Sequence, residues 1–436
     1  MNASLDLRRR LTRNMSWQSG SQIVGLLLGL ATTRLLTWKL GKVGWGRFSF
    51  LFGFIVLFQA FSDLGVSTLL IRDLAKTPER TRELVRHVLG LKVLIATGAM
   101  VAAWITAAFT PLDPKQRWAI DVFALILPIQ AMTLPAAILQ AQLRFARTSV
   151  IEILTRVSGF VLMVGAVALG YHLMGVTLAL VGGELVGLAA VLFATRGLAS
   201  AVPTFDSPRW RMLLAASLPL GAAAILVAIV NRFDFQMLQW MLPASIRDVE
   251  IGYYGAAYRV PQLVERLPLL VMATIFPIMS QLSVASPIRL QQLYHQTLRN
   301  FALIAAPMVA IVTWQAPMML RLLCGPGYEP AVPMLRLLVW SSAFVYVAVV
   351  AGNLLIAIGH QGASLRAWVI AAPINIGLNL MLIPRYGARG AAASTSVSFL
   401  IVLLIVLVLA ERRLKDTIIG QTPVSIVPAG EPSRVR

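Results

Sequence analysis

The sequence predicts an all-α polytopic membrane protein, with about twelve transmembrane helices in two six-helix lobes around a central cavity. The residues are 58% hydrophobic and only 13% charged, which leaves more apolar surface than a soluble protein of 436 residues could bury. Apolar runs of about 20 residues, the length that crosses a bilayer, recur along the whole chain. Short motifs also recur in the same order in both halves, which indicates two related lobes with a binding site between them.

The predicted spans are joined by short connections, except for the segment between residues 195 and 212, which contains two prolines. We interpret this segment as the joint between an N-terminal six-helix lobe (1–200) and a C-terminal one (201–410). Residues 411–436 are polar, and we expect them to form a disordered cytoplasmic tail. The expected spans are 17–37, 48–71, 88–109, 118–141, 150–170, 174–195, 212–241, 251–282, 298–322, 332–358, 367–384 and 389–410.

The basic N-terminus resembles the start of a signal peptide, because four arginines between residues 8 and 13 precede the first apolar run. That run contains Arg34, and no small-residue cleavage site follows it. We therefore expect a first span that is retained.

Basic residues outside the spans are distributed unevenly between the two sides of the membrane. If the N-terminus is cytoplasmic, 24 of the 38 Lys and Arg residues fall on the cytoplasmic side, 8 on the other side and 6 in or near spans. Cationic loops are enriched on the cytoplasmic side of membranes. We therefore expect both termini in the cytoplasm and an even number of spans.

The two halves share three motif pairs, which predict that the lobes are repeats of the same orientation. The paired residues are 208, 209 and 215 positions apart, so the spacing is nearly constant. In the second pair, Thr77-Pro78 and Ser286-Pro287, a hydroxyl residue before a proline predicts the start of a short cytoplasmic helix. The pairs are Gly44 and Gly252, Pro78 and Pro287, and Gly175 and Gly390.

The composition argues against several other functions. The net charge of +20 is spread over short loops, so we expect no nucleic-acid partner. The single cysteine, Cys324, cannot form an intramolecular disulfide, and the four histidines lack metal-ligand spacing, so we expect no metal site. There is no Gly-rich Lys-Ser/Thr nucleotide loop and no extramembrane domain for a glycosyltransferase, so we expect no cofactor and no enzymatic activity.

Four segments carry a family resemblance: "LGKVGWGRFSF" (40–50), "FSDLGVSTLLIRDLA" (61–75), "NRFDFQML" (231–238) and "IGYYGAAYRV" (251–260). With these segments the chain resembles the polysaccharide-biosynthesis membrane proteins that flip lipid-linked oligosaccharides. These are the O-antigen-type flippases of the multidrug/oligosaccharidyl-lipid/polysaccharide exporter superfamily. The resemblance extends from about Trp17 to Ala410 and implies a V-shaped, two-lobed bundle with a central polar cavity.

The resemblance implies that the protein moves an undecaprenyl-diphosphate-linked glycan from the cytoplasmic to the periplasmic leaflet of a bacterial inner membrane. Its partners would be the lipid-linked glycan, the membrane, and polysaccharide polymerase and chain-length proteins. A drug or cation antiporter of the same superfamily is the alternative, although the excess of arginines in the spans favours an anionic substrate. A membrane-embedded glycan polymerase or ligase is disfavoured because the outer loops are short. The sugar, the pathway (O-antigen, capsule or exopolysaccharide), the coupling ion (H⁺ or Na⁺) and the oligomeric state stay open.

Charged residues inside the spans are the candidate site, because a charge at membrane depth costs roughly 2.5–3.5 kcal/mol on insertion scales. Arg34 lies late in the first span, where it either contacts the diphosphate or reaches the outer interface. The resemblance favours contact with the substrate, since cationic first-span residues recur in such flippases. Asp63 in the second span either pairs with Arg34 or binds a coupling cation, and we favour the pair.

The stretch 228–242, "AIVNRFDFQMLQWML", continues a long apolar run but carries Arg232 and Asp234. Asn231 and Asp234 are three positions apart, and Arg232 and Gln236 are four apart, so each pair lies close together on a helix. We expect these residues to form one polar face that lines the cavity and binds substrate. The alternative is that the span simply ends near Asn231.

The eighth span carries three charges, Arg259, Glu265 and Arg266. The two arginines are seven positions apart and share a helix face, which we interpret as a cationic substrate-binding face. An ion pair with another span is the alternative, with Glu265 as the structural or coupling carboxylate. Pro261 and Pro268 bracket this stretch and are candidate bending points.

Two further groups have more than one interpretation. Glu184 lies among apolar and small residues, where a coupling role as a protonatable group competes with a structural one. Glu152 and Arg156 are four apart and predict a local ion pair. Three tyrosines could stack on sugars, but we favour an interfacial aromatic belt. They are Tyr253, Tyr254 and Tyr258.

Overall fold

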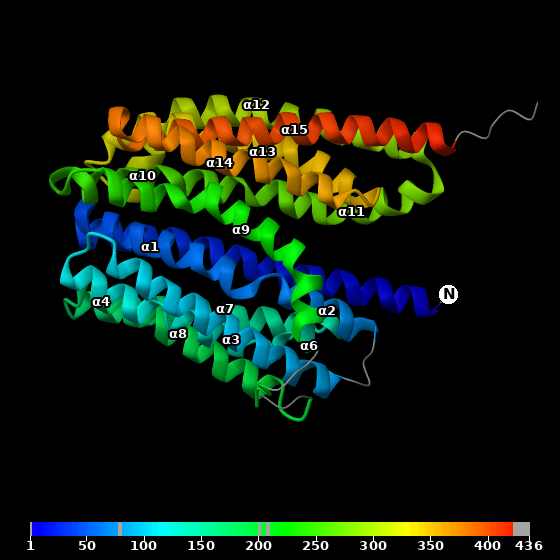
Figure 1. The fold of residues 1–436 in the computed structure, drawn as a ribbon, viewed down its shortest axis with the longest axis horizontal. Coiled ribbons are helices and arrows are strands. Elements are labelled where there is room, and N and C mark those ends of the chain that lie inside the picture. The colour runs from blue at the N-terminus through cyan, green and yellow to red at the C-terminus, as the bar shows by residue number, and fades with distance from the viewer. Residues whose placement is uncertain (1, 77–80, 199–201, 206–209, 422–436) are drawn as a thin grey trace, which may run out of the picture.

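The computed structural model describes residues 2–76, 81–198, 202–205 and 210–421, and within these ranges the regular structure is helical. Figure 1 shows two lobes that lie side by side. The first lobe contains α1 (Asn2–Asp63), α2 (Val66–Lys76), α3 (Thr81–Ala108), α4 (Pro114–Phe123), α5 (Ile126–Met132), α6 (Ala136–Ala141), α7 (Phe145–Ala168) and α8 (His172–Ala194). The rest of the chain forms α9 (Trp210–Met241), α10 (Ala244–Val264), α11 (Arg266–Ala285), α12 (Pro287–Cys324), the 3-10 helix η2 (Glu329–Ala331), α13 (Val332–Ala357), α14 (Gln361–Tyr386) and α15 (Ala388–Gln421).

In the described part of the chain, ten segments are long and apolar enough to cross a membrane, so this is a multi-pass membrane protein. One of them, Gly20–Asp63, is longer than a single crossing needs, and α4–α6 form a further crossing from three short helices. When both limbs of α1 and the α4–α6 segment are counted, the fold has the twelve spans expected from the sequence.

The chain reverses direction within α1 at Gly41, whose φ of 66° and ψ of −172° are not helical. Glycine tolerates this left-handed φ because it has no Cβ. Ser21 in the first limb donates to Glu152, and Gln59 in the second limb donates to Gln130. These two contacts, one near the start of α1 and the other near its end, lie at the same level of the lobe. The two limbs are therefore antiparallel, as Figure 1 also shows.

Proline breaks two of the predicted spans into shorter helices. The predicted span 118–141 begins earlier, at Pro114, and is interrupted before Pro135. The predicted span 251–282 breaks at Glu265 between α10 and α11. Pro268 has no N–H that could donate to the carbonyl of Val264. The hydroxyl of Tyr346 donates to that carbonyl instead, at 3.1 Å. The expected bending point at Pro268 is confirmed.

Helix α9 crosses from one lobe to the other (Figure 1). At its start, the indole of Trp210 donates to the carbonyl of His87 in α3. A Cβ on Gly221 would lie 2.5 Å from the backbone of Leu64, so this part of α9 packs tightly on the first lobe. Beyond Pro219, which lies inside the helix, α9 continues into the second lobe.

The second predicted helix start is confirmed, because Ser286 caps α12 by accepting from the backbone N–H of Arg289, and Pro287 is the first helical residue. The equivalent Thr77-Pro78 lies outside the described residues. The expected tail is wrong in its first part, because α15 continues to Gln421 and residues 411–421 are helical. The rest of that tail, like part of the joint between the lobes, lies outside the described residues.

The hydrophobic cores show where the lobes meet. One core contains residues of both lobes, among them Trp45 and Phe48 of α1 and Phe235 of α9. At the other end each lobe has its own core, built around Leu70 and Leu89 in the first lobe and around Leu354 in the second. We call the end with the shared core, near Gly41, Asp113 and Asp248, the joined end, and the opposite end the split end.

Candidate functional site at the lobe interface

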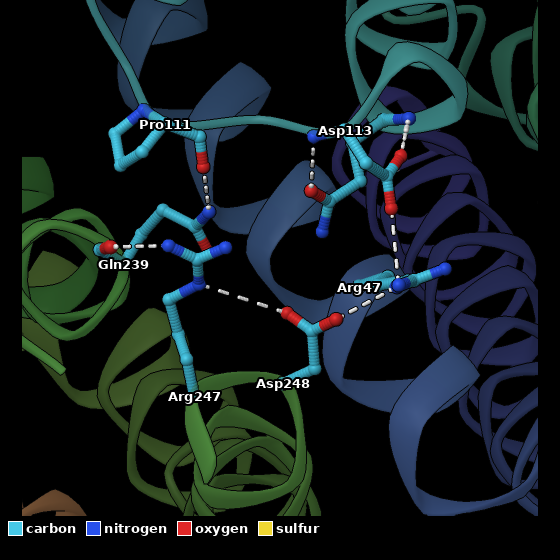
Figure 2. Close-up of polar contacts among 7 residues, drawn as sticks. Arg47, Pro111, Asp113, Gln239, Arg247 and Asp248 are labelled. Carbon is cyan, nitrogen blue, oxygen red and sulfur yellow. Dashed lines mark hydrogen bonds and ion pairs between the residues drawn. The ribbon is translucent and has the colours of Figure 1, made fainter. Parts of the chain in front are cut away.

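Arg47 lies between two carboxylates at the joined end and links the lobes (Figure 2). Its Nη2 is 3.0 Å from Oδ2 of Asp113 in its own lobe, and its Nε donates to Oδ2 of Asp248 in α10 at 2.7 Å. Asp113 is itself fixed by a capping box with Gln116 at the start of α4. The bond from Arg47 to Asp248 is therefore the one that breaks if the lobes separate here.

A second polar contact crosses the interface beside Arg47 (Figure 2). The side-chain amide of Gln239 in α9 donates to the carbonyl of Pro111 in the first lobe at 2.9 Å. Arg247 supports both contacts, because its Nη1 is 3.5 Å from the carbonyl oxygen of Gln239 and its Nε is 3.9 Å from Asp248. We call this group the Arg47 clasp. It comprises Arg47, Pro111, Asp113, Gln239, Arg247 and Asp248.

Glycines allow the backbones of α1 and α10 to touch at the clasp. A Cβ on Gly46 would lie 1.7 Å from the carbonyl oxygen of Asp248, and one on Gly252 would lie 2.4 Å from that of Lys42. Neither position has room for a side chain in this arrangement. The lobes therefore meet here through backbone contact and polar bonds.

Two of the predicted arginines lie at the lobe interface below the clasp. Arg259 in α10 donates from Nε to the hydroxyl of Thr33 in α1 at 2.8 Å, which joins the two lobes. Arg232 in α9 lies over the ring of Phe52 in α1, with its guanidinium carbon 6.0 Å from the ring centroid. It also lies 5.1 Å from the ring centroid of Tyr258. The structure thus brings Arg232 and Arg259 together on one surface.

Another predicted arginine, Arg266, is exposed at the start of α11, seven residues after Arg259. Glu265 beside it accepts from the hydroxyl of Ser342 at 2.9 Å. No ion pair joins Glu265 to an arginine among the described residues. The carboxylate of Glu265 is therefore bonded inside its own lobe, and Arg266 is left accessible.

Asp234 is fully buried inside the second lobe and does not reach the lobe interface. Its carboxylate accepts three hydrogen bonds, from the hydroxyls of Tyr254 and Thr395 at 2.6 Å each and from the amide of Asn379 at 2.9 Å. A buried carboxylate with three donors is well satisfied without a cation in contact. Asp234 therefore ties α9 to α10, α14 and α15.

The expected single polar face on α9 is wrong. Residues two positions apart on a helix are separated by about 200°, so Arg232 and Asp234 point to opposite sides. Arg232 faces the first lobe, whereas Asp234 and Asn231 face tyrosines of α10, with Asn231 accepting from Tyr258 at 2.9 Å. The alternative, that the span ends near Asn231, is also wrong because α9 continues to Met241.

The expected pair of Asp63 with Arg34 is wrong, because the reversal at Gly41 places the two residues at opposite ends of the lobe. Asp63 instead forms an ion pair with Lys92 in α3 at 2.9 Å and accepts from Ser67. Arg34 lies at the joined end, where its Nη1 would be 2.9 Å from a Cβ on Gly325. Asp63 thus has a different partner from the one expected.

Glu184 belongs to a hydrogen-bonded group inside the first lobe. It accepts from the amide of Gln130 at 3.1 Å, and Gln130 is also bonded to Gln59. The predicted pair of Glu152 and Arg156 is confirmed nearby. This group joins α1, α5 and α8, away from the interface arginines.

The expected interfacial belt of tyrosines is wrong, since all three are buried in the core that the two lobes share. Sequence reasoning does not predict the Arg47 clasp, because Arg47 and Arg247 lie just outside the predicted spans. The glycine-aromatic motifs around Gly46 and Gly252 were the available signal for this contact.

Within the described residues, no group of three or more His, Cys, Asp or Glu side chains comes together as metal ligands would.

Two curated proteins are similar in sequence. The probable low-salt glycan biosynthesis flippase Agl15 of Haloferax volcanii is 25% identical over 275 residues, which are 61% of this chain and 55% of that protein. An uncharacterised membrane protein of Methanocaldococcus jannaschii is 23% identical over 128 residues, 29% of this chain and 25% of that protein. The matches thus span about half or less of the length of these relatives.

Solved structures share the fold at low sequence identity. The lipid II flippase MurJ in an inward closed conformation has a TM-score of 0.74 at 14% identity, covering 92% of this chain and 90% of that one. An inward-facing multidrug resistance transporter of the MATE family has a TM-score of 0.71 at 15% identity, with 91% and 96% covered. A MOP-superfamily transporter from Pyrococcus furiosus has a TM-score of 0.65 at 15% identity, with 94% and 95% covered.

The family model for polysaccharide biosynthesis proteins matches residues 11–283, which is more than half of the chain. That range contains α1 from residue 11 onward, α2 to α10 and most of α11, including the Arg47 clasp and the interface arginines. The two-lobed fold and the family match agree with the resemblance seen in the sequence. This chain is a member of the polysaccharide biosynthesis protein family, with the fold of the multidrug/oligosaccharidyl-lipid/polysaccharide exporter superfamily.

Proposed function

We propose that this protein flips a polyprenyl-diphosphate-linked oligosaccharide from the cytoplasmic to the periplasmic leaflet by alternating access, for assembly of a surface polysaccharide. The observation that carries the proposal is the row of arginines on the second lobe of a polysaccharide biosynthesis family member. Arg232 and Arg259 lie at the lobe interface, and Arg266 is exposed next to it. These three residues are the proposed substrate-binding groups.

Arginine suits a diphosphate for physical reasons. Its planar guanidinium can donate two parallel hydrogen bonds to a phosphate, and it stays charged when partly desolvated. An attraction between charges is also several times stronger near a low-dielectric wall than in bulk water. The present partners of Arg232 and Arg259 are an aromatic ring and neutral oxygens, so a phosphate does not have to displace a carboxylate.

The orientation completes the proposal. With both termini in the cytoplasm, the split end faces the cytoplasm and the Arg47 clasp closes the periplasmic end. Substrate would then enter between the lobes from the cytoplasmic leaflet, and lobes 1–200 and 201–410 would rock to open the clasp. Asp234, Asp63, Glu184 and Glu265 are proposed to hold helices within each lobe, and a coupling role for Glu184 or Asp234 stays open to test.

The test is a flipping assay with purified protein in liposomes. A polyprenyl-diphosphate oligosaccharide with a fluorescent label is placed in the bilayer, and a membrane-impermeant quencher reports the fraction in the outer leaflet over time. Arg232→Ala, Arg259→Ala and Arg266→Ala should each slow flipping. Lysine at the same positions should restore part of the rate, because the charge remains but the paired hydrogen bonds of the guanidinium are lost.

Arg336→Ala is the matched control, because Arg336 lies in α13 and bonds to the carbonyl of Thr313, away from the lobe interface. Its flipping rate should equal that of the unmodified protein. Normal flipping by all three interface variants would refute the proposal. Transport of a cationic dye without flipping of the lipid would favour the drug or cation antiporter instead.

A further inference from the structure

An open pocket of about 610 Å³ lies at the joined end, on the side of the lobe interface where α1 meets the end of α12. The first lobe contributes Arg34, Trp38 and Lys42, and the second contributes the loop 324–328, "CGPGY". The lining therefore combines two cations from one lobe with a glycine-rich loop from the other.

The loop is shaped so that both cations can lie directly against it. Gly325 and Gly327 have φ values of 93° and 87°, which favour glycine. A Cβ on Gly325 would be 2.9 Å from Nη1 of Arg34, and one on Gly327 would be 2.9 Å from Nζ of Lys42. Both glycines thus leave room for a guanidinium or an ammonium group at the backbone.

The pocket keeps a positive charge. Among the described residues neither Arg34 nor Lys42 forms an ion pair within 4.0 Å. The carboxylate of Glu329 accepts from the N–H of Gly327 and lies near Lys42 and Arg321, so it offsets only one of three cations. An anion can therefore be attracted without removing an existing partner.

A polar group of the pocket is also unsatisfied. Tyr328 is 3% exposed, and its hydroxyl has no hydrogen-bond partner in the described structure. A buried hydroxyl without a partner costs roughly 1–3 kcal/mol, so such groups are usually bonded to something. Trp38 on the opposite side is 70% exposed, as expected of an indole at a membrane interface.

The pocket is next to the proposed substrate-binding arginines. Arg259 bonds to Thr33, the residue before Arg34. Cys324, which lines the pocket, lies close enough to both Arg259 and Arg34 for their charges to act on it. A phosphate that leaves Arg259 toward this end of the molecule would therefore meet Arg34 and then Lys42.

We propose that this pocket is an exit subsite, which holds the diphosphate of the lipid-linked product in the outer leaflet before release. The inference rests on the proposed function and adds a second phosphate-binding position to it. Arg34 can donate two parallel hydrogen bonds to phosphate oxygens. Lys42 contributes a positive charge, and Tyr328 contributes a hydroxyl donor. The exposed Trp38 marks the side on which the polyprenyl chain stays in lipid.

The experiment locates a diphosphate lipid on the full-length protein without requiring transport. A photoactivatable polyprenyl diphosphate is bound to the protein in phosphatidylcholine nanodiscs, cross-linked, and mapped by mass spectrometry. Cross-links should include the loop 324–328. Excess polyprenyl diphosphate should compete, and the same excess of phosphatidylglycerol, the ordinary anionic phospholipid, should not.

The variants test the named groups. Arg34→Gln with Lys42→Gln should reduce cross-linking at the loop about tenfold or more, because two charge-assisted contacts are lost. Tyr328→Phe should reduce it several-fold, whereas a hydroxyl that only fills space would leave it unchanged and remove Tyr328 from the site. Lys115→Gln, an exposed cation of the same end and lobe, is the control and should have no effect.

The outcomes separate this proposal from the proposed function. Loss of flipping with intact cross-linking at the loop would count against the transport activity alone. Flipping with no cross-link at the loop, or with a cross-link unchanged by the double substitution, would overturn the exit subsite alone. Equal competition by phosphatidylglycerol would also overturn it, because the pocket would then be a site for ordinary phospholipid headgroups.

Discussion

The substitution Asp248→Asn should favour separation of the lobes at the joined end. It keeps the size of the side chain but removes the charge that Arg47 meets at 2.7 Å across the interface. Arg47 retains Asp113 in its own lobe, and Arg247 loses only an ion pair of 3.9 Å within α10. The loss therefore falls on the contact between the lobes.

The structure sets the size of the effect. The side chains of Arg47 and Asp248 are 32% and 15% exposed, so their attraction is only partly screened by solvent. Exposed pairs contribute about 0.2–1 kcal/mol, and hydrogen bonds to charged groups about 1.5–3 kcal/mol. An intermediate value of about 1–2 kcal/mol corresponds to a shift of about 5–30-fold in the ratio of joined to separated molecules.

Electron–electron double resonance measures that ratio directly. Spin labels can be placed at Lys115→Cys in the first lobe and Tyr386→Cys in the second, since both side chains are exposed at the joined end. The buried native Cys324 is replaced by alanine in all variants. Asp248→Asn should add or enlarge a population at longer distance.

A double-mutant cycle with Arg47→Gln tests the reasoning. If the two side chains act through their bond, the double variant should shift the distances little more than either single variant. Asp416→Asn is the control, because Asp416 pairs with Arg413 on the exposed face of a single helix. Distance distributions that are unchanged in Asp248→Asn, or fully additive in the double variant, would refute the role of the clasp.

Three other expectations follow from the fold. Gly46→Ala should also favour lobe separation in the same spin-label assay, because its Cβ would lie 1.7 Å from the carbonyl oxygen of Asp248, whereas Gly29→Ala in α1 has free space and should not. Asp234→Asn should lower the unfolding temperature of the purified protein, because at least one of the three groups that donate to Asp234 would then meet the amide N–H of the new side chain. An unchanged unfolding temperature would contradict the bonding described. A reporter fused to the C-terminus should be active only in the cytoplasm, and periplasmic activity would reverse the proposed orientation.

Local features of the fold could be predicted from the sequence because their causes are local. The apolar runs indicated the spans, Ser286-Pro287 indicated the start of α12, and Pro268 indicated the break between α10 and α11. The pair of Glu152 and Arg156 follows from helical spacing alone. Each of these depends on residues within one short segment of the chain.

The contacts of the charged groups could not be predicted, because their partners are distant in the sequence. Asp234 bonds to residues 145 and 161 positions away, and Arg47 to one 201 positions away. Asp63 pairs with Lys92 of α3, and the sequence does not show which residues of α3 pack against the end of α1. Amphipathic spacing gives the face of a helix but not the neighbour that the face meets.

The clasp cannot hold the joined end alone, because aromatic side chains are packed between the lobes just below it. Trp45 and Phe52 of α1 line a small pocket together with Phe235 and Tyr258 of the second lobe. An aromatic side chain buries roughly 150–250 Å², and at about 25 cal/mol per Å² the exposure of a few of them to water costs several kcal/mol. That exceeds the value of about 1–2 kcal/mol assigned to the contact between Arg47 and Asp248.

Opening at the joined end must therefore be offset by burial elsewhere in the same movement. The split end can supply it, because the lobes have separate cores there and closing would bring their facing surfaces together. A molecule open at both ends would lack both contacts and should be rare. In the proposed cycle the aromatic contacts thus enforce alternation, while the clasp adjusts the balance between the two states, which is why its loss should shift populations rather than abolish closure.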